Sequence, residues 1–315
     1  MSNHHPLISI VSPVYRAENI VDKLVERITN EVSKVTDEFE VILVEDGSPD
    51  NSWGKIKENC QRDHRIKGIK LSRNFGQHFA ITAGIEQCKG DYVVVMDCDL
   101  QDDPVYIPTM YQKALEGFDI VYTVKKSRRH SIWKNFTANI YNKIFNYLVE
   151  NKNWKTNSNV GSYSMLNRKV VNAFNTFNDF QRHYLMVLRW LGFNCTYLEI
   201  EHNERYEGKS SYNFSKLVLH AISGITSQSD KLLRLNVALG LILSMLSFLS
   251  IILIIILYFT IGFKSGWTSM IVVILFSTGI ILTSIGISGI YIGKTFEQTK
   301  NRPRYLIDQF LNKQD

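Results

Sequence analysis

Two long apolar runs in the last third of the chain constrain its architecture more than any other feature. Residues 235–263 and 268–292 contain no Asp, Glu, Lys or Arg. As a helix, each run is long enough to cross the roughly 30 Å hydrocarbon core of a membrane with some tilt. Because only residues 264–267 separate them, the sequence predicts a C-terminal hairpin of two transmembrane helices.

The charges around these runs predict how the hairpin is oriented. Basic residues flank its outer ends at Lys231, Arg234, Lys294, Lys300, Arg302 and Arg304. Lysine and arginine accumulate on the cytoplasmic side of membrane segments, so both termini are expected in the cytoplasm. The N-terminus has no signal-peptide pattern, since residues 1–6 are polar and the apolar stretch 7–14 is short. We therefore expect a cytoplasmic domain in residues 1–231, two membrane helices in 235–293 and a cytoplasmic tail in 294–315.

The first 124 residues have the alternating pattern of an α/β fold. Short runs rich in β-branched residues predict five strands, at residues 7–14, 39–44, 66–71, 92–96 and 120–124. Helical periodicity lies between them, as in residues 20–35, where apolar side chains recur every four positions. Strands joined in this way form a mostly parallel, Rossmann-like sheet that binds ligands at the carboxyl ends of its strands.

The formal charge of +6 is concentrated in one region. Residues 125–155 contain eight lysines or arginines and one acid, a pattern that fits either nucleic acid or anionic lipid. The nearby membrane segments favour lipid, so no nucleic-acid partner is expected. Residues 132–149 place aromatic and aliphatic side chains on one helical face, and residues 212–230 form a second amphipathic stretch. Both are interpreted as interfacial helices, although a core helix has the same pattern.

Acidic residues follow the fourth predicted strand, in the stretch Met96-Asp97-Cys98-Asp99-Leu100-Gln101-Asp102-Asp103. Alternation along an extended chain would send Asp97, Asp99 and Gln101 to the same side. Oxygen ligands in this arrangement suit Mg²⁺ or Mn²⁺ bound jointly with a diphosphate. Asp102 and Asp103 fit a turn that caps the following helix, and a solvated capping turn is the alternative interpretation of the stretch.

The first two predicted strands end in residues suited to a nucleoside. After the second strand, Asp46 can accept hydrogen bonds from a base or ribose, and Gly47 allows the backbone to turn beside it. At the end of the first strand, Pro13 and Tyr15 can place a rigid backbone and an aromatic ring beside a nucleobase. Parallel strands end at the same edge of a sheet, so these residues and the acids are expected to line one crevice.

Four motifs occur in a characteristic order: Ser12-Pro13-Val14-Tyr15, Glu45-Asp46-Gly47-Ser48, Leu71-Ser72-Arg73-Asn74-Phe75-Gly76 and Met96-Asp97-Cys98-Asp99-Leu100-Gln101-Asp102. Together they resemble the GT-A catalytic domain of family 2 glycosyltransferases. The similarity is greatest to the branch of dolichol-phosphate mannose synthases and bacterial undecaprenyl-phosphate glycosyltransferases. It covers nearly the whole chain, since the two-span tail and two further motifs share it: Asn159-Val160-Gly161-Ser162-Tyr163 and Arg205-Tyr206-Glu207-Gly208-Lys209-Ser210-Ser211-Tyr212.

The resemblance implies roles for the residues that match its motifs. It implies a UDP-, GDP- or dTDP-linked sugar donor held by Pro13, Tyr15, Glu18, Asp46 and Asp97. It implies a Mg²⁺ or Mn²⁺ ion bound by Asp99, Gln101 and Asp97. The acceptor phosphate would be surrounded by Arg128, Arg205, Lys209 and Ser210, whose arginines form planar, always-charged forks. The implied catalytic set is Asp97, Asp99, Arg128 and Arg205. Relatives often read Tyr-Asn-Glu where this chain has Tyr15-Arg16-Ala17-Glu18, which is one residue longer.

The implied reaction is a metal-dependent, inverting transfer of a sugar to a polyprenyl (undecaprenyl) phosphate at the inner membrane of a bacterium, for cell-surface glycan or lipid modification. A phosphate acceptor is already an anion, so the transfer needs neither a strong general base nor a covalent enzyme intermediate.

Other functions make different demands on the sequence. A transferase with a saccharide acceptor would need a base, for which Asp179 is a candidate; capping of a helix at residues 181–190 is its other interpretation. A nonenzymatic scaffold or transporter is disfavoured by the charge-free spans and would leave the acids unexplained. Gly289 and Gly293 can let membrane helices approach closely and so suggest a homo-oligomer, although glycine is common in such helices.

Overall fold

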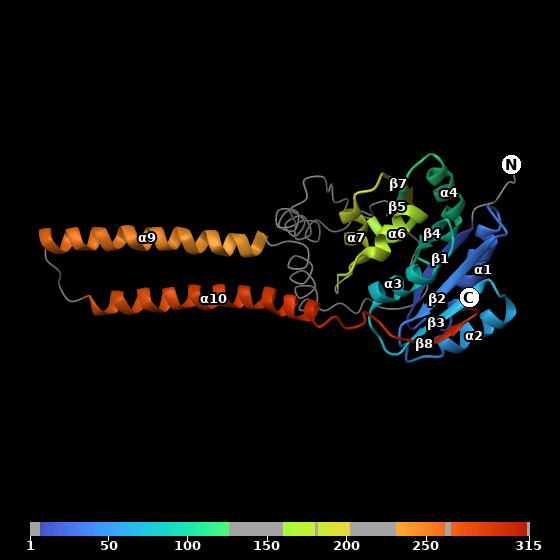
Figure 1. The fold of residues 1–315 in the computed structure, drawn as a ribbon, viewed down its shortest axis with the longest axis horizontal. Coiled ribbons are helices and arrows are strands. Elements are labelled where there is room, and N and C mark those ends of the chain that lie inside the picture. The colour runs from blue at the N-terminus through green and yellow to red at the C-terminus, as the bar shows by residue number, and fades with distance from the viewer. Residues whose placement is uncertain (1–6, 126–159, 180–181, 202–230, 262–265, 314–315) are drawn as a thin grey trace. The chain divides into compact units, whose positions relative to one another are not determined.

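A computed structural model describes residues 7–125, 160–179, 182–201, 231–261 and 266–313 (Figure 1). The chain divides into two compact units. The first contains the described residues up to 201 together with residues 302–313, and the second contains the two long C-terminal helices. The interfacial helices expected near 132–149 and 212–230 lie outside the described residues.

An eight-stranded mixed sheet forms the centre of the first unit, in the order β7-β5-β6-β4-β1-β2-β3-β8. The strands are β1 (Ile8–Val14), β2 (Phe39–Glu45), β3 (Ile66–Leu71), β4 (Tyr92–Val95), β5 (Ile120–Lys125), β6 (Val160–Asn167), β7 (Cys195–Ile200) and β8 (Ile307–Leu311). Pairing is parallel through β4-β1-β2-β3 and between β5 and β7. It is antiparallel where β6 meets β4 and β5, and where β8 meets β3. The predicted α/β fold is confirmed, and the five predicted strands agree with β1 to β5 to within one residue at each end.

Helices cover both faces of this sheet (Figure 1). On one face lie α1 (Val21–Val32), α2 (Ser52–Arg62) and α4 (Ile107–Leu115), the last preceded by the 3₁₀ turn η1 (Pro104–Tyr106). On the other lie α3 (Gln77–Gln87), α6 (Arg168–Thr176) and α7 (Tyr184–Leu191). Strand alternation creates the two cores: Phe39, Val41 and Leu43 of β2 enter the first, whereas Ile42 and Val44 enter the second.

Helix α3 approaches the sheet very closely at one position. A Cβ atom on Gly84 would lie only 2.3 Å from Cγ1 of Val11 on β1. All residues from Ala80 to Ile85 are buried, so the helix is enclosed along its middle. Glycine at position 84 therefore sets how near α3 lies to β1.

Strand β8 lies in the predicted tail, where the sequence pattern indicates no strand. It pairs with β3, and Asn312 beyond it donates hydrogen bonds of 2.8 Å to the carbonyl oxygens of Cys60 and Ile66. Its first three residues are exposed, so it lacks the apolar alternation that identifies a half-buried strand. The described end of the chain is therefore part of the same unit as the central sheet.

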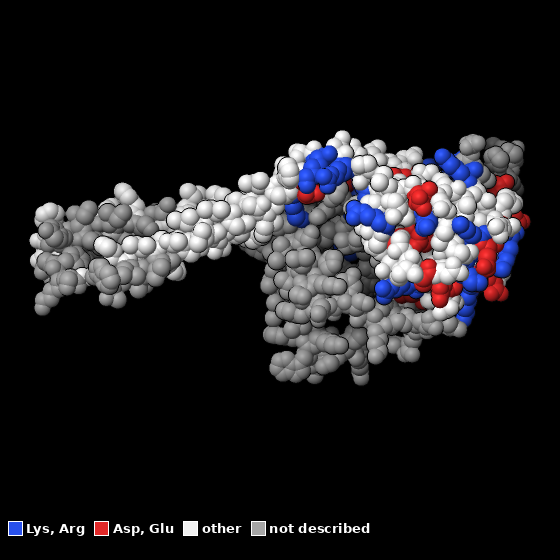
Figure 2. Space-filling model, turned by 90° about the horizontal axis from the view of Figure 1, so that it is seen from below, with Lys and Arg blue, Asp and Glu red and all other residues white. Residues whose placement is uncertain are grey.

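The second unit contains α9 (Lys231–Ile261) and α10 (Trp267–Thr299), which include the described parts of both predicted apolar runs. Residues 231–250 and 276–299 are long and apolar enough to cross a membrane. Large apolar side chains are exposed along both helices, and their described surfaces are largely white in Figure 2. Such surfaces need a nonaqueous environment or a partner. The Nδ2 atom of Asn236 on α9 donates to Oγ of Ser284 on α10 at 2.8 Å.

Candidate active site

The strands β1, β2 and β4 end at a common edge of the sheet. The parallel register pairs Val14 with Glu45 and Val11 with Val95. The residues that follow these strands, Tyr15, Asp46 and Asp97, therefore lie along that edge, as the sequence predicts.

Asp46 holds the loop that follows β3. Its side chain is 3% exposed, and Oδ1 and Oδ2 accept the backbone N–H groups of Phe75 at 2.7 Å and Gly76 at 2.9 Å. Burial raises the pKa of the Asp46 carboxyl above its ordinary value, although these two donors act to lower it. Asp46 therefore shapes the loop directly. Contact between Asp46 and a nucleoside stays a prediction.

The neighbouring Gly47 lets this loop lie close to the end of β2. Gly47 has a φ of +60°, and a Cβ atom there would lie 2.3 Å from the backbone nitrogen of Asn74. Any larger residue would meet both a strained backbone conformation and a backbone clash. The predicted role of Gly47 in the turn is confirmed, and the motifs at residues 45–48 and 71–76 are in contact.

Asp97 connects three elements of the fold. Its Oδ1 atom accepts a hydrogen bond from Nε2 of Gln77 at 2.7 Å and another from Oγ of Ser162 at 3.0 Å. Gln77 is the first residue of α3, and Ser162 lies on β6. The motifs around Asp97 and Ser162 therefore meet in space. Gln77 was not predicted as a site residue, because a lone glutamine after a glycine-containing loop has no distinctive pattern.

The chain turns immediately after Asp97. Leu100 has a φ of +58°, and Oδ1 of Asp99 accepts the N–H of Gln101 at 3.1 Å. The expectation of an extended chain through residues 97–101 is therefore wrong, because pairing of β4 ends at Val95 and Asp99 stabilises a local turn. The oxygen atoms of Asp97, Asp99 and Gln101 are ligand types that Mg²⁺ and Mn²⁺ accept. Among the described residues, no three His, Cys, Asp or Glu side chains form a group that could hold a metal.

Asp103 has a structural role, as its capping interpretation predicts. Its Oδ1 atom accepts the N–H of Val105 at 3.1 Å at the start of η1. Both of its carboxylate oxygens also accept from Nη2 of Arg27 at 2.8 Å. The acidic stretch after β4 therefore includes one residue committed to the fold.

The loop after β1 presents Tyr15 to solvent. The Tyr15 side chain is 43% exposed, and the Arg16 guanidinium lies 5.5 Å from the centre of its ring, whereas Pro13 is buried in β1. Glu18 joins this loop to the one after β2, because its Oε2 atom accepts the N–H of Asn51 at 2.7 Å. The predicted donor contacts of Pro13, Tyr15 and Glu18 stay predictions.

The four predicted acceptor-site residues, Arg128, Arg205, Lys209 and Ser210, lie outside the described residues. Asp179 is described and exposed, but α7 begins at Tyr184 with His183 at the N-cap position. Helix capping by Asp179 is therefore wrong, because the helix starts later than its sequence pattern suggests.

The sheet has helices on both faces, and acidic residues follow its central parallel strands. This is the architecture of a GT-A glycosyltransferase. Residues 9–174 match the family model described as glycosyl transferase family 2. The chain therefore belongs to glycosyltransferase family 2 and is a transferase.

Similar proteins extend over almost the whole chain. An uncharacterized glycosyltransferase of Synechocystis sp. is 35% identical over 302 residues, which cover 95% of this chain and 94% of the relative. The undecaprenyl-phosphate 4-deoxy-4-formamido-L-arabinose transferase of Proteus mirabilis is 31% identical, with coverage of 96% and 94%. A crystal structure of a mycobacterial protein shares the fold at 15% identity, with a TM-score of 0.51 over 69% of this chain and 71% of that one.

Proposed function

We propose that this glycosyltransferase moves a sugar from a nucleotide-sugar to a polyprenyl phosphate at a bacterial inner membrane. The main observation behind this proposal is that one chain combines acidic residues at the strand ends with two long apolar helices. A lipid acceptor would require both features, because its phosphate head group must reach the donor while its polyprenyl tail stays in the membrane. The relative from Proteus mirabilis, which is named for an undecaprenyl-phosphate acceptor and matches 96% of this chain, supports the proposal.

The donor side of the proposal rests on the edge formed by β1, β2 and β4. Tyr15 offers an exposed ring to the base, and Asp46 holds the 72–76 loop beside it. Asp97, Asp99 and Gln101 would hold Mg²⁺ or Mn²⁺ together with the donor diphosphate, since the described acids supply too few ligands by themselves. The bound ion would offset the negative charge that grows on the departing nucleoside diphosphate.

The acceptor side of the proposal assigns Arg128, Arg205, Lys209 and Ser210 to the lipid phosphate. Guanidinium groups bind phosphate oxygens through paired hydrogen bonds and keep their charge at any physiological pH. The phosphate oxygen attacks the anomeric carbon while the bond to the nucleoside diphosphate breaks, so the configuration inverts. The phosphate acceptor is already an anion, so the reaction needs no general base and Asp179 has no catalytic role in it.

The proposed membrane arrangement follows from α9 and α10. They cross the bilayer as a hairpin, and the basic residues at their outer ends keep the sheet-bearing unit and both termini in the cytoplasm. Segments 132–149 and 212–230 lie along the membrane surface in this arrangement. Gly289 and Gly293 on α10 have open space where a side chain would be, which suits close packing against a second copy.

Membranes containing the protein test this function directly. They are incubated with undecaprenyl phosphate and radiolabelled UDP-, GDP- and dTDP-sugars, with and without a chelator, and the lipid product is analysed by mass. One sugar is expected on the lipid phosphate, and chelation should remove the product. Label in a saccharide, with none on lipid phosphate, would instead identify a saccharide-extending transferase.

A variant separates the acceptor from the donor. Arg205→Ala should reduce use of the lipid phosphate by about 100-fold while nucleoside diphosphate binding, measured by calorimetry with Mn²⁺, changes by less than about threefold. Equal losses in both measurements would remove Arg205 from the acceptor site.

A further inference from the structure

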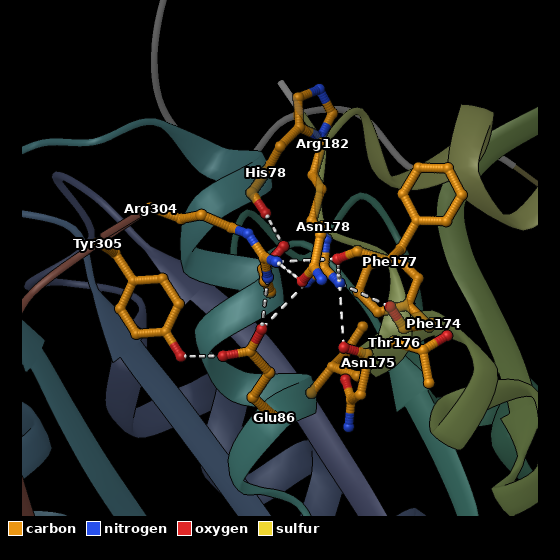
Figure 3. A network of polar contacts seen from close by, with 12 residues as sticks. His78, Glu86, Phe174, Asn175, Thr176, Phe177, Asn178, Arg182, Arg304 and Tyr305 are labelled. Carbon is orange, nitrogen blue, oxygen red and sulfur yellow. Dashed lines mark hydrogen bonds and ion pairs between the residues drawn. The ribbon is translucent and has the colours of Figure 1, made fainter. Parts of the chain in front are cut away.

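Glu86, in the last turn of α3, is the centre of a polar network that the sequence motifs do not include (Figure 3). Its Oε1 atom accepts from Nη1 of Arg182 at 3.0 Å and from Nη1 of Arg304 at 3.1 Å. Its Oε2 atom accepts from the hydroxyl of Tyr305. One carboxylate therefore joins α3 to Arg182, two residues before α7, and to the segment between α10 and β8.

The cations around Glu86 are also fixed to the backbone. Arg182 has a fully buried side chain and donates through Nη2 to the carbonyl oxygen of Phe174 at 2.6 Å. Arg304 donates through Nη2 to the carbonyl oxygen of Phe177 at 2.9 Å. Burial, followed by the nearby charge of Arg304, lowers the pKa of Arg182. The two guanidinium groups repel each other, so Glu86 is needed to hold them together.

The opposite end of α3 enters the candidate active site. Gln77, its first residue, donates to Asp97, and Gly76 just before the helix donates to Asp46. The 11 residues of α3 span roughly 16 Å, and the close approach at Gly84 prevents the helix from moving towards β1. If a short helix enclosed in this way shifts as a rigid body, a displacement at Glu86 displaces Gln77 as well.

We propose that Glu86, Arg304 and Tyr305 form a positioning junction through which the chain segment following α10 sets the placement of Gln77 against Asp97. This inference rests on the proposed donor site and adds residues to it that touch no substrate. The position of Gln77 at the donor site would then depend on the segment that connects α10 to β8. Loss of the junction should impair donor use at temperatures where the protein stays folded.

The test uses the full-length protein in lipid nanodiscs and two conservative variants. Glu86→Gln keeps the size of the side chain but removes its charge, and Tyr305→Phe removes only the hydroxyl that donates to Glu86. Gln309→Ala is the matched control, because it removes one hydrogen bond, from Nε1 of Trp53 at 3.2 Å, from the same C-terminal segment without touching α3. Donor kcat/KM, affinity for a nucleoside diphosphate with Mn²⁺, and Tm are measured for each.

Both junction variants should lose about tenfold in donor kcat/KM, measured well below Tm, whereas Gln309→Ala should stay within about twofold of the wild type. Restoring a carboxylate with Glu86→Asp should recover part of the loss. A lower Tm with kinetics like those of Gln309→Ala would make the junction merely structural and overturn the inference. If Glu86→Gln fails to fold, Tyr305→Phe alone decides between these results.

The wild-type measurement separates this inference from the proposed function. A wild-type protein that binds no nucleoside diphosphate with Mn²⁺ and labels no lipid overturns the proposed donor site, and the inference with it. A fully active wild type whose junction variants match the control overturns the inference alone.

Discussion

The two ends of strand β2 hold buried carboxylates in opposite ways. At its start, Glu40 is 4% exposed and bonds to the ammonium group of Lys67 and to the N–H of Lys89 at 2.6 Å. Just beyond its end, Asp46 is 3% exposed and accepts two backbone N–H groups. Burial alone raises both pKa values, but the donors around Glu40 outweigh it and lower that pKa, whereas the pKa of Asp46 stays raised.

The difference separates charges that serve stability from charges that shape a site. Lys67 neutralises Glu40 at the start of β2, and Ser9 and Lys89 donate further hydrogen bonds to this carboxylate, so the charge is balanced within the fold. Asp46 is balanced by peptide dipoles instead, and the same bonds fix the loop beside the predicted nucleoside. The adjacent Glu45 also has a raised pKa because of burial. Acids at the carboxyl end of β2 are thus held at some expense to the fold.

The largest expected effect comes from the acids that follow β4. Asp99→Ala should lower kcat by about 1,000-fold or more, because it removes a proposed ligand of the ion that stabilises the leaving group. Expression should be retained and Tm should fall only slightly, because Asp99 is partly buried and its bond to the N–H of Gln101 stabilises only a local turn. The measurement is turnover of labelled donor on undecaprenyl phosphate.

Asp103→Asn is the control for that experiment. It weakens the pairing with Arg27 and the cap of η1, so about 1 kcal/mol of stability should be lost while kcat is retained. If Asp99→Ala keeps its turnover, or if Asp103→Asn loses as much, the assignment of Asp99 to the metal is wrong.

At the other end of β2, Lys67→Met should destabilise the protein by about 3 kcal/mol, because it leaves Glu40 buried without its countercharge. Kinetic constants of the folded variant should match the wild type. Urea denaturation followed by fluorescence gives the stability. The double variant Glu40→Gln with Lys67→Met should recover most of the loss, and a loss below about 1 kcal/mol in Lys67→Met would show that the pair is unimportant.

Asp46→Asn should cost less stability than Lys67→Met but should have a larger effect on binding. The amide keeps one acceptor oxygen but turns an NH₂ group towards a backbone N–H of the 75–76 turn. Nucleoside diphosphate affinity, measured by calorimetry with Mn²⁺, should fall by about tenfold. Unchanged affinity would show that Asp46 has no role in binding the nucleoside diphosphate.

The smallest effect is a difference in pH dependence. The pKa of Glu40 is lowered in the folded state, so its stabilising contribution is present above its ordinary value of 4.5 and is lost as pH falls through the folded value. The pKa of Asp46 is raised from 3.8, so its contribution is present below that value and is lost as pH rises through the folded value.

Thermal unfolding between neutral pH and about pH 3.5 measures this contrast. As pH falls, the Tm advantage of the wild type over Glu40→Gln should shrink, while the wild type should gain relative to Asp46→Asn. Parallel curves for the two variants would contradict the assigned directions of the pKa shifts.

The sequence predicts the central strands well because β1 and β2 are buried at every position and their apolar runs are unmistakable. It fails for β6, β7 and β8, which mix polar with apolar residues and show no regular alternation of buried and exposed positions. The order of the motifs correctly places Asp46 and Asp97 at one edge. Strand periodicity cannot foresee the turn at Leu100, and the partnership of Gln77 with Asp97 arises only from the tertiary fold.

Strand β8 has a consequence for how the chain is made. Since β8 follows α10, a ribosome completes both apolar helices before it adds the strand that covers the edge of β3. Throughout that interval the nascent sheet exposes an unpaired edge of the kind that recruits other chains. The edge of β3 therefore stays uncovered until β8 is made, and any delay in accommodating the hairpin prolongs the period in which the newborn protein can aggregate.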